Sequence, residues 1–113
     1  MATLGSLKEN EFLNSWVVKA SGDNAAATAT KAASPGRVYY VTAVAAGFSA
    51  AVTKILQIKD GATVIAEFPI VNGDIISLSS PLAITPGNAV SAVLAASGTG
   101  GNVGYVNLFG FTA

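Results

Sequence analysis

Six carboxylates are the main candidates for acid–base or metal chemistry, because the sequence contains neither histidine nor cysteine. The absence of these two residue types excludes a Ser-His-Asp triad, a thiolate nucleophile, disulfide bonds and a Cys/His zinc site. General acid–base catalysis needs paired titratable groups whose pKa values are pushed apart. Neither such a pair nor a D-x-D-x-D calcium spacing is visible, so we expect no enzyme activity, no metal site and no cofactor. The six acids are Glu9, Glu11, Asp23, Asp60, Glu67 and Asp74.

Two local features come closest to a catalytic or phosphate-binding motif. Glu67 lies in the middle of an expected strand, where we expect it to be solvated or to pair across the strands with Lys54 or Lys59. The segment Gly98-Thr-Gly-Gly101 is rich in glycine, but no Lys-Ser/Thr follows it and a strand follows instead of a helix. We therefore interpret Glu67 as a surface residue and the glycine-rich segment as a hairpin loop.

Composition and charge indicate a small folded protein that works through contacts. The chain has 113 residues, of which 51% are apolar and 11% are charged, and its net charge is zero. One domain of this hydrophobicity should fold, and the balanced charge argues against nucleic acid or a membrane surface as a partner. All charged side chains lie between Lys8 and Asp74, so residues 75–113 carry none. This uncharged third predicts a surface that meets another protein; alternatively, its Ser, Thr and Asn residues keep it solvated.

The sequence shows no targeting or spanning segment. No basic stretch leads into an apolar one near the N-terminus, so no signal peptide is expected. A spanning helix needs about 20 mostly apolar residues, and the apolar runs here are broken well before that length. We therefore expect a cytosolic product, or one that leaves its cell by a route other than secretion.

From Trp16 onward, Gly, Pro and β-branched residues recur about every eight to twelve positions, which is the spacing of a β-sandwich or barrel. Asp60-Gly61 predicts a type I′ hairpin, and the long loop 79–88 predicts a crossover between two sheets. The expected fold is all-β: an antiparallel two-sheet sandwich that is jelly-roll-like, with an Ig-like sandwich as the alternative. Its eight strands are Trp16–Ala20, Ala25–Ala33, Arg37–Ala46, Lys54–Lys59, Thr63–Ile70, Asp74–Ser79, Ala89–Ser97 and Asn102–Phe111.

Alternation along the strands assigns side chains to the two faces of each sheet. The strand Arg37–Ala46 is apolar on both faces, with Val38, Tyr40 and Val44 on one side and Tyr39, Val41 and Ala45 on the other, which predicts a central strand. In the last strand, Val103, Tyr105, Asn107, Phe109 and Phe111 alternate with Gly104, Val106, Leu108 and Gly110.

Residues 1–15 differ from the rest and predict a short N-terminal arm, with the sandwich domain covering residues 16–113. Ser6 and Glu9 have the spacing of a capping box at the start of a helix. One or two helical turns are marginal alone, so this arm is expected to dock on its own domain or on a neighbour.

Several segments of the chain resemble the small jelly-roll decoration (cement) proteins of tailed-bacteriophage capsids. The resemblance covers about residues 37–113 and is carried by Asp60–Ile65, Pro81–Val90, Leu94–Gly98 and Gly104–Thr112. It implies a homotrimer that binds the exterior of an assembled shell, with an N-terminal arm that contacts the major capsid protein. The apolar residues of the arm that would then be candidate partner contacts are Leu4, Leu7, Phe12, Leu13 and Trp16.

The alternative is a carbohydrate- or receptor-binding module of a phage tail or fibre protein, because such proteins use similar sandwiches. A sugar platform places several aromatic rings on one exposed face. Tyr39 and Tyr40 cannot both contribute to it because neighbouring side chains alternate. We expect most of the aromatic rings to lie in the core.

Overall fold

Eight β-strands build the part of the chain that the structure, a computed structural model, describes, which is residues 14–113. Residues 14–113 contain no helix, and hence none long and apolar enough to cross a membrane. The all-β expectation is therefore confirmed. The strands are β1 (Ser15–Asp23), β2 (Ala27–Lys31), β3 (Tyr39–Phe48), β4 (Thr53–Asp60), β5 (Thr63–Val71), β6 (Gly73–Ala83), β7 (Val90–Leu94) and β8 (Val103–Thr112).

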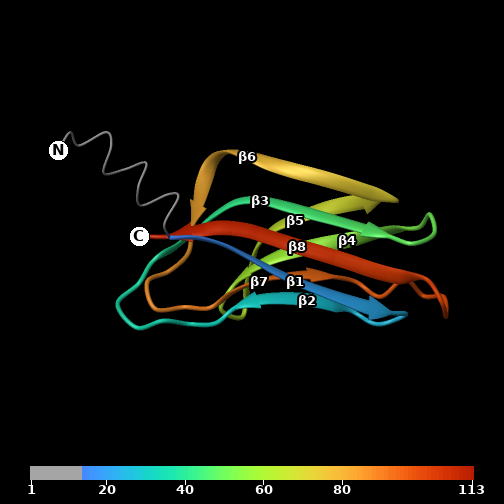
Figure 1. Ribbon diagram of the computed structural model, residues 1–113, viewed down its shortest axis with the longest axis horizontal. Helices are drawn as coiled ribbons and strands as arrows, with labels where there is room; N and C mark the ends of the chain where they lie inside the picture. The colour runs from blue at the N-terminus through green and yellow to red at the C-terminus, as the bar shows by residue number, and fades with distance from the viewer. Residues whose placement is uncertain (1–13) are drawn as a thin grey trace.

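The strands pair as four nested antiparallel couples, β1 with β8, β2 with β7, β3 with β6 and β4 with β5 (Figure 1). They form two four-stranded sheets with the orders β1-β8-β3-β6 and β2-β7-β4-β5. Every connection except the β4–β5 hairpin passes from one sheet to the other. This nested order is that of a jelly roll and not of an Ig-like sandwich, and β3 lies between two neighbours, as its apolar faces predict.

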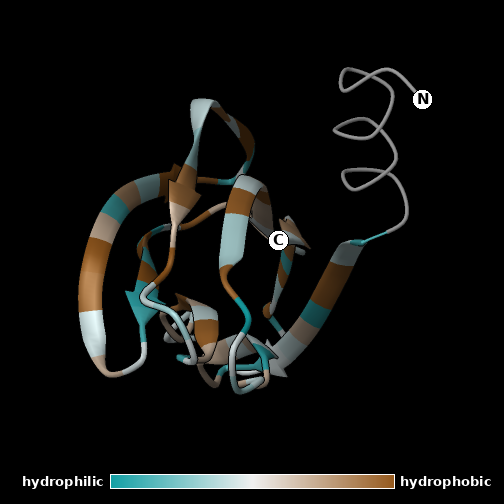
Figure 2. Ribbon diagram, turned by 90° about the vertical axis from the view of Figure 1, so that its left-hand side faces the viewer, coloured by the Kyte–Doolittle hydropathy of each residue, from teal (hydrophilic) through white to brown (hydrophobic). Residues whose placement is uncertain are grey.

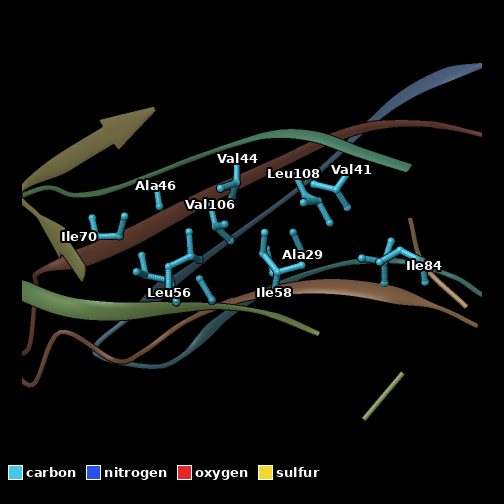
Figure 3. Close-up of a cluster of buried hydrophobic side chains, with 14 of the residues drawn as sticks. Ala29, Val41, Val44, Ala46, Leu56, Ile58, Ile70, Ile84, Val106 and Leu108 are labelled. Atoms are coloured by element: carbon cyan, nitrogen blue, oxygen red, sulfur yellow. The ribbon is translucent and has the colours of Figure 1, made fainter. Parts of the chain in front are cut away.

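The core lies between the two sheets and is built mainly from branched aliphatic side chains. Seen along the long axis in Figure 2, hydrophobic and hydrophilic residues alternate along the strand ribbons. Figure 3 shows Val44, Val106 and Leu108 of the first sheet pointing toward Leu56 and Ile58 of the second. All five are fully buried. Burial of a side chain of this size contributes roughly 1.5–3 kcal/mol, so this layer supplies most of the drive to fold.

A bulge in β3 overturns the predicted assignment of its side chains to two faces. The pairing of β3 with both of its neighbours shifts register between Val41 and Ala43. Side chains on both sides of the bulge therefore reach the core: Val41 before it and Val44 after it are fully buried. Strict alternation places Val44 on the face of Tyr40, which is wrong, because Tyr40 points away from the core and stacks on Phe111. A bulge inserts one extra residue into a strand. In a run of apolar residues, the sequence does not show where that residue lies.

Two predicted turns differ from the structure. A turn is expected after Ala20, but β1 continues to Asp23, which still pairs with Val103 of β8. The β4–β5 hairpin is confirmed, but its two-residue loop is Gly61-Ala62, and of these only Gly61 has a positive φ (60°). The predicted type I′ turn needs positive φ at both loop residues and is wrong; glycine at the first loop position is typical of type II′.

The crossover between β6 and β7 passes between the sheets, as predicted for loop 79–88, but it begins later. Residues 78–81 have no partner on β3, after which Leu82 pairs with Val41 and extends β6 to Ala83. Pro81 lies in this unpaired stretch, where its missing N–H costs no ladder hydrogen bond. The crossover is therefore shortened to residues 84–89.

A cluster of buried polar groups joins three loops at the end of the sandwich where β8 begins. Asn102 is 6% exposed, and its Oδ1 accepts hydrogen bonds from the backbone N–H of Ala50 (2.9 Å) and the hydroxyl of Ser49 (3.2 Å). Its Nδ2 donates to the carbonyl oxygen of Ala50 at 3.1 Å. The hydroxyl of Ser97, also buried, donates to the carbonyl oxygen of Asn102 at 2.8 Å. The side-chain amide of Asn102 thus provides the loop after β3 with the hydrogen bonds that a neighbouring strand would otherwise provide.

At the opposite end, Asp60 holds the β6–β7 crossover against the β4–β5 hairpin. Its Oδ2 accepts hydrogen bonds from the backbone N–H (2.9 Å) and hydroxyl (2.7 Å) of Thr85, and its Oδ1 accepts one from Nδ2 of Asn88 (2.9 Å). Partial burial acts to raise the pKa of Asp60, but the hydrogen bonds from Thr85 and Asn88 outweigh it, so the pKa lies below that of a free aspartate.

We expect part of the acid sensitivity of the fold to arise from Asp60. Because folding lowers its pKa, the stabilisation is fully present above the ordinary aspartate pKa of about 3.9 and is lost as pH falls through the lower folded value. Asp60→Asn should lower the free energy of unfolding at pH 7 by about 1–2 kcal/mol and flatten its slope against pH below about 4. Urea unfolding at several pH values measures both. Asp74→Asn is the control, since Asp74 accepts only from the N–H of Ile75, and equal slopes for both variants would contradict the prediction.

Candidate binding face

The carboxylates of the described residues are engaged separately and form no common site. Glu67 is exposed and its Oε2 accepts a hydrogen bond from Nε2 of Gln57 at 3.2 Å, so its cross-strand partner is neither Lys54 nor Lys59. Asp23 and Asp60 bond to donors on two different loops, and Asp74 bonds to the N–H of the residue that follows it in β6. Residues 14–113 contain no group of three or more His, Cys, Asp or Glu side chains that could hold a metal ion. The geometry of this part of the chain therefore offers surfaces for contact instead of a pair of acids.

The glycine-rich segment connects β7 and β8 and lacks the features of a phosphate loop. Gly98 and Gly101 have positive φ values of 86° and 83°, as expected for tight turning. The N–H of Gly101 donates to the carboxylate of Asp23 at 2.8 Å. An aspartate in this position would repel a phosphate, which agrees with the interpretation of the segment as a loop.

The outward side of the sheet β1-β8-β3-β6, called here the outer face, carries exposed apolar and aromatic side chains. Tyr105 and Phe109 of β8 are 50% and 38% exposed, Val17 of β1 is 55% exposed, and Ile75 of β6 is 74% exposed. On β8 the outward residues are those that the alternation predicted, because Gly104, Val106, Leu108 and Gly110 are buried instead. The outer face is therefore a water-exposed surface with the residue types of a protein interface.

The register between the strands determines which large and small side chains are neighbours on the outer face. Phe109 lies between Val17 of β1 and Ala43 of β3, and Tyr105 lies between Ser21 and Gly47. The large rings of Tyr105 and Phe109 on β8 thus stand beside small residues on β3, and they form a ridge along β8, called here the aromatic ridge. At one end of this ridge, Phe111 stacks on Tyr40 with ring centroids 5.1 Å apart and an interplanar angle of 12°.

Two shallow depressions flank the ridge. One, of about 350 Å³, is lined by Lys19, Ser21, Tyr105 and Asn107 among others. The second, of about 400 Å³, lies at Val17, Thr42 and Phe109. Depressions beside exposed rings are places where a partner's side chains can insert, and buried anchors of this kind dominate the energy of protein interfaces.

Charge is nearly absent from the outer face. The two central strands, β8 and β3, contain no charged residue, and Lys19 and Asp23 lie on the edge strand β1. Depletion of charge at the centre with aromatic enrichment is the compositional mark of interfaces. The opposite sheet also exposes aliphatic side chains, which are Ile55, Val64, Ile65 and Val71. It differs in carrying charged and polar outward side chains, among them Thr28, Thr30, Gln57, Lys59 and Glu67, and in that none of its large exposed hydrophobic side chains is aromatic. Strand β8, which belongs to the uncharged C-terminal third of the sequence, thus lies in the middle of one face.

The residues predicted to contact a partner are placed only in part. Leu4, Leu7, Phe12 and Leu13 lie outside the described residues. Trp16 belongs to β1, where its ring packs edge-on against Tyr39 at a centroid distance of 5.7 Å and an interplanar angle of 74°. Its ring is therefore largely part of the fold, and a role in partner contact stays a prediction.

The sequence predicted a contact surface in the uncharged C-terminal third, which includes β8, but it did not predict which residues form the outer face. The uncharged stretch and the alternation of Tyr105 and Phe109 with Val106 and Leu108 mark β8 as a strand with two apolar faces. What sequence reasoning lacked was the strand order, which puts Val17 and Ile75 on the same side of the same sheet as β8.

Comparisons with known proteins show similarity of fold. No family model matches the sequence, and no curated protein does. Among solved structures, a chain in the acidic stable capsid structure of Helicobacter pylori bacteriophage KHP30 matches with a TM-score of 0.56 and 14% identity over 87% of each chain. The insecticidal delta-endotoxin Cry8Ea1 from Bacillus thuringiensis matches with a TM-score of 0.53 and 17% identity over 80% of this chain and 18% of the toxin. The β-sandwich is thus shared with a phage capsid component of similar length and with one part of a toxin.

Proposed function

We propose that this protein is a virion structural protein that binds the outer surface of an assembled bacteriophage capsid and stabilises it. In this role it is made in the host cytoplasm, acts as a homotrimer and contacts the major capsid protein without catalysis. The observation that carries the proposal is the outer face, whose aromatic ridge on β8 carries no charge. The similarity to a chain of comparable length in a phage capsid structure supports it at the level of the fold.

The physical action that we propose needs binding alone. A protein that binds the assembled shell, but not its separated or disordered subunits, stabilises the shell by RT ln(1 + [L]/Kd) for each site. A site that spans two neighbouring capsid subunits is complete only in the assembled shell, which gives the required difference in affinity. Many of the core positions are alanine or valine, and small residues bury little area each. Assembly into a trimer would bury additional surface and stabilise each subunit.

The direct test uses shells of the virus that encodes this protein, assembled without it. We expect the purified protein to sediment with such shells, to raise their temperature of disruption, and to be trimeric by light scattering. A protein that is strictly monomeric and does not sediment with the shells would refute the proposal.

Variants of the outer face make the test specific. Replacing both Tyr105 and Phe109 with serine should weaken shell binding by about 2 kcal/mol or more, which is roughly 30-fold. The matched control is Ile55→Ser, because Ile55 is 44% exposed but lies on the other sheet. Equal loss in the control and in the double variant would show that the outer face is not the contact surface.

A carbohydrate- or receptor-binding module is the second candidate, and one observation favours it. The half-exposed ring of Tyr105 stands beside Asn107 and Ser21 in the depression of about 350 Å³, so that an apolar surface adjoins amide and hydroxyl groups. This is the combination that a sugar ring requires. Saturable binding on a glycan array that Tyr105→Ala abolishes would favour this candidate over shell binding.

A further inference from the structure

A second concave site lies at one end of the sandwich, between the two sheets. It is a pocket of about 270 Å³, lined among others by Trp16, Lys31, Ser34, Arg37, Tyr39 and Thr112. Trp16, Tyr39 and Thr112 belong to the sheet β1-β8-β3-β6, Lys31 ends β2 of the other sheet, and Ser34 and Arg37 lie on the β2–β3 loop. The pocket is therefore assembled by the fold from three stretches of the chain, at β1, from the end of β2 to the start of β3, and at the end of β8.

We propose that this pocket binds a carboxylate group. Two cationic side chains line it, and one is held in place by aromatic rings. Nζ of Lys31 lies 5.7 Å from the ring centroid of Trp16 and 5.9 Å from that of Tyr39, which are distances of cation–π attraction. Arg37 is exposed at the β2–β3 loop, where its backbone N–H donates to the carbonyl oxygen of Ser34 at 3.1 Å.

The positive charge of this pocket is not neutralised by the acidic side chains of residues 14–113. Asp60 bonds to Thr85 and Asn88, and the other three bond to Gly101, Gln57 and Ile75. Lys31 and Arg37 thus form no ion pair within this part of the chain. Two cations that converge on a partly enclosed space attract an anion, and a guanidinium group suits a carboxylate because it can donate two parallel hydrogen bonds.

The indole of Trp16, which lines the pocket with part of its surface, carries a buried donor that lacks an acceptor. Nε1 of Trp16 is the one buried side-chain polar atom of the described residues without a hydrogen-bond partner. An unsatisfied buried donor costs about 1–3 kcal/mol, and such groups commonly mark a site that an absent acceptor fills. A carboxylate supplies two acceptor oxygens and the negative charge, and it is small enough for this volume.

Two acidic side chains of the sequence lie outside the described residues and are one source of a carboxylate for the pocket, and a separate molecule is the other source. Glu9 and Glu11 precede Asn14 by a few residues, and Asn14 also lines the pocket. The three steps from Glu11 to Asn14 span at most about 11 Å, so the Glu11 carboxylate is within reach. The proposal does not depend on the virion role, because it uses none of the exposed rings of the outer face.

The single tryptophan of the chain provides the readout. The 113-residue protein has one indole N–H resonance, which is expected to move when a carboxylate binds beside the Trp16 ring. Sodium acetate is titrated into the wild type and into the variant with Glu9→Gln and Glu11→Gln. Sodium chloride keeps the ionic strength constant, and acetamide serves as the neutral control of the same shape.

Two results support the proposal and also distinguish the source of the carboxylate. A saturable shift in the wild type indicates a pocket open to a separate carboxylate. A shift in the double variant alone, whose indole resonance already differs from the wild type, indicates that Glu9 or Glu11 fills the pocket. In either case Lys31→Gln and Arg37→Gln should each weaken acetate binding about tenfold, which corresponds to about 1.4 kcal/mol. Lys59→Gln, on the outward side of the other sheet, should leave it unchanged.

Three results would overturn the proposal. The first is an indole resonance that acetate does not shift in either protein. The second is an equal shift with acetamide, and the third is an acetate affinity that neither Lys31→Gln nor Arg37→Gln changes. Arg37→Gln keeps the test valid if Lys31→Gln fails to fold, because Arg37 is exposed on a loop.

Discussion

Gly110→Ala is expected to destabilise the protein by about 3 kcal/mol or more, as severe overpacking does. A Cβ atom at residue 110 would lie 2.6 Å from Cη2 and Cζ2 of Trp16 and closer still to the carbonyl oxygen of Tyr40. The indole cannot withdraw easily because it packs against Tyr39. The carbonyl oxygen belongs to β3, the neighbour of β8, so relief of the clash requires these two strands to separate.

Urea unfolding, with two other glycine variants as controls, measures this effect. Gly100→Ala should be nearly neutral, since no atom lies within 4 Å of its added Cβ and its φ is not positive. Gly104→Ala should have an intermediate cost, because its Cβ would meet side-chain atoms of Phe48 and Leu94 at 3.1–3.3 Å, and side chains adjust more readily than backbone. If Gly110→Ala unfolded at the same urea concentration as Gly100→Ala, the placement of the Trp16 ring over β8 would be wrong.

Asn102→Ala should cost about 3 kcal/mol, through the loss of its side-chain hydrogen bonds at about 1 kcal/mol each. The side chain accepts from the N–H of Ala50 and the hydroxyl of Ser49, and it donates to the carbonyl oxygen of Ala50. Asn102 is only 6% exposed, whereas Ser49 and Ala50 are exposed, so the loop loses its attachment to the buried amide. The loop after β3 should then open first, which hydrogen exchange at Ala50 would detect.

A second substitution separates donor from acceptor. Asn102→Asp keeps the acceptor toward Ala50 and Ser49 but replaces the donor with an oxygen that faces the carbonyl oxygen of Ala50. It should therefore destabilise at least as much as alanine at neutral pH. As a control for loss of an amide, Asn88→Ala removes a single hydrogen bond, to Asp60, and should cost about 1 kcal/mol. Equal effects at Asn102 and Asn88 would contradict the importance of the buried cluster.

Strand number, strand type and the two-sheet architecture could be predicted from the sequence because each depends on local information. Alternation in β8 and the turn residues around Asp60-Gly61 fix local conformation, and burial then follows. The position of this hairpin was correct, although its turn type was not. The other predictions failed where a distant partner decides the outcome. The β3 bulge depends on what β8 and β6 present opposite Val41 and Ala43. The end of β1 depends on Val103, which is still available to pair with Asp23.

The candidate binding face was predictable only as a tendency. An uncharged C-terminal third and two-sided apolar alternation indicated a buried or contacting surface, but they could not say which residues share it. Val17, Phe109 and Ala43 are far apart in the sequence and become neighbours only through the order β1-β8-β3. The pocket proposed to bind a carboxylate could not be predicted for the same reason, since Lys31 and Trp16 come from different sheets.

The pairing of β1 with β8 also determines when this chain can acquire its structure during synthesis. Ser15 pairs with Phe111, and β8 lies between β1 and β3, so one sheet has a gap at its centre until the last strand has left the ribosome. Contacts so distant along the chain are slow to form because long loops must close first. Folding of this sandwich is therefore completed only after β8 has left the ribosome. Until then its unpaired apolar strands are available to neighbouring chains, so folding competes with aggregation.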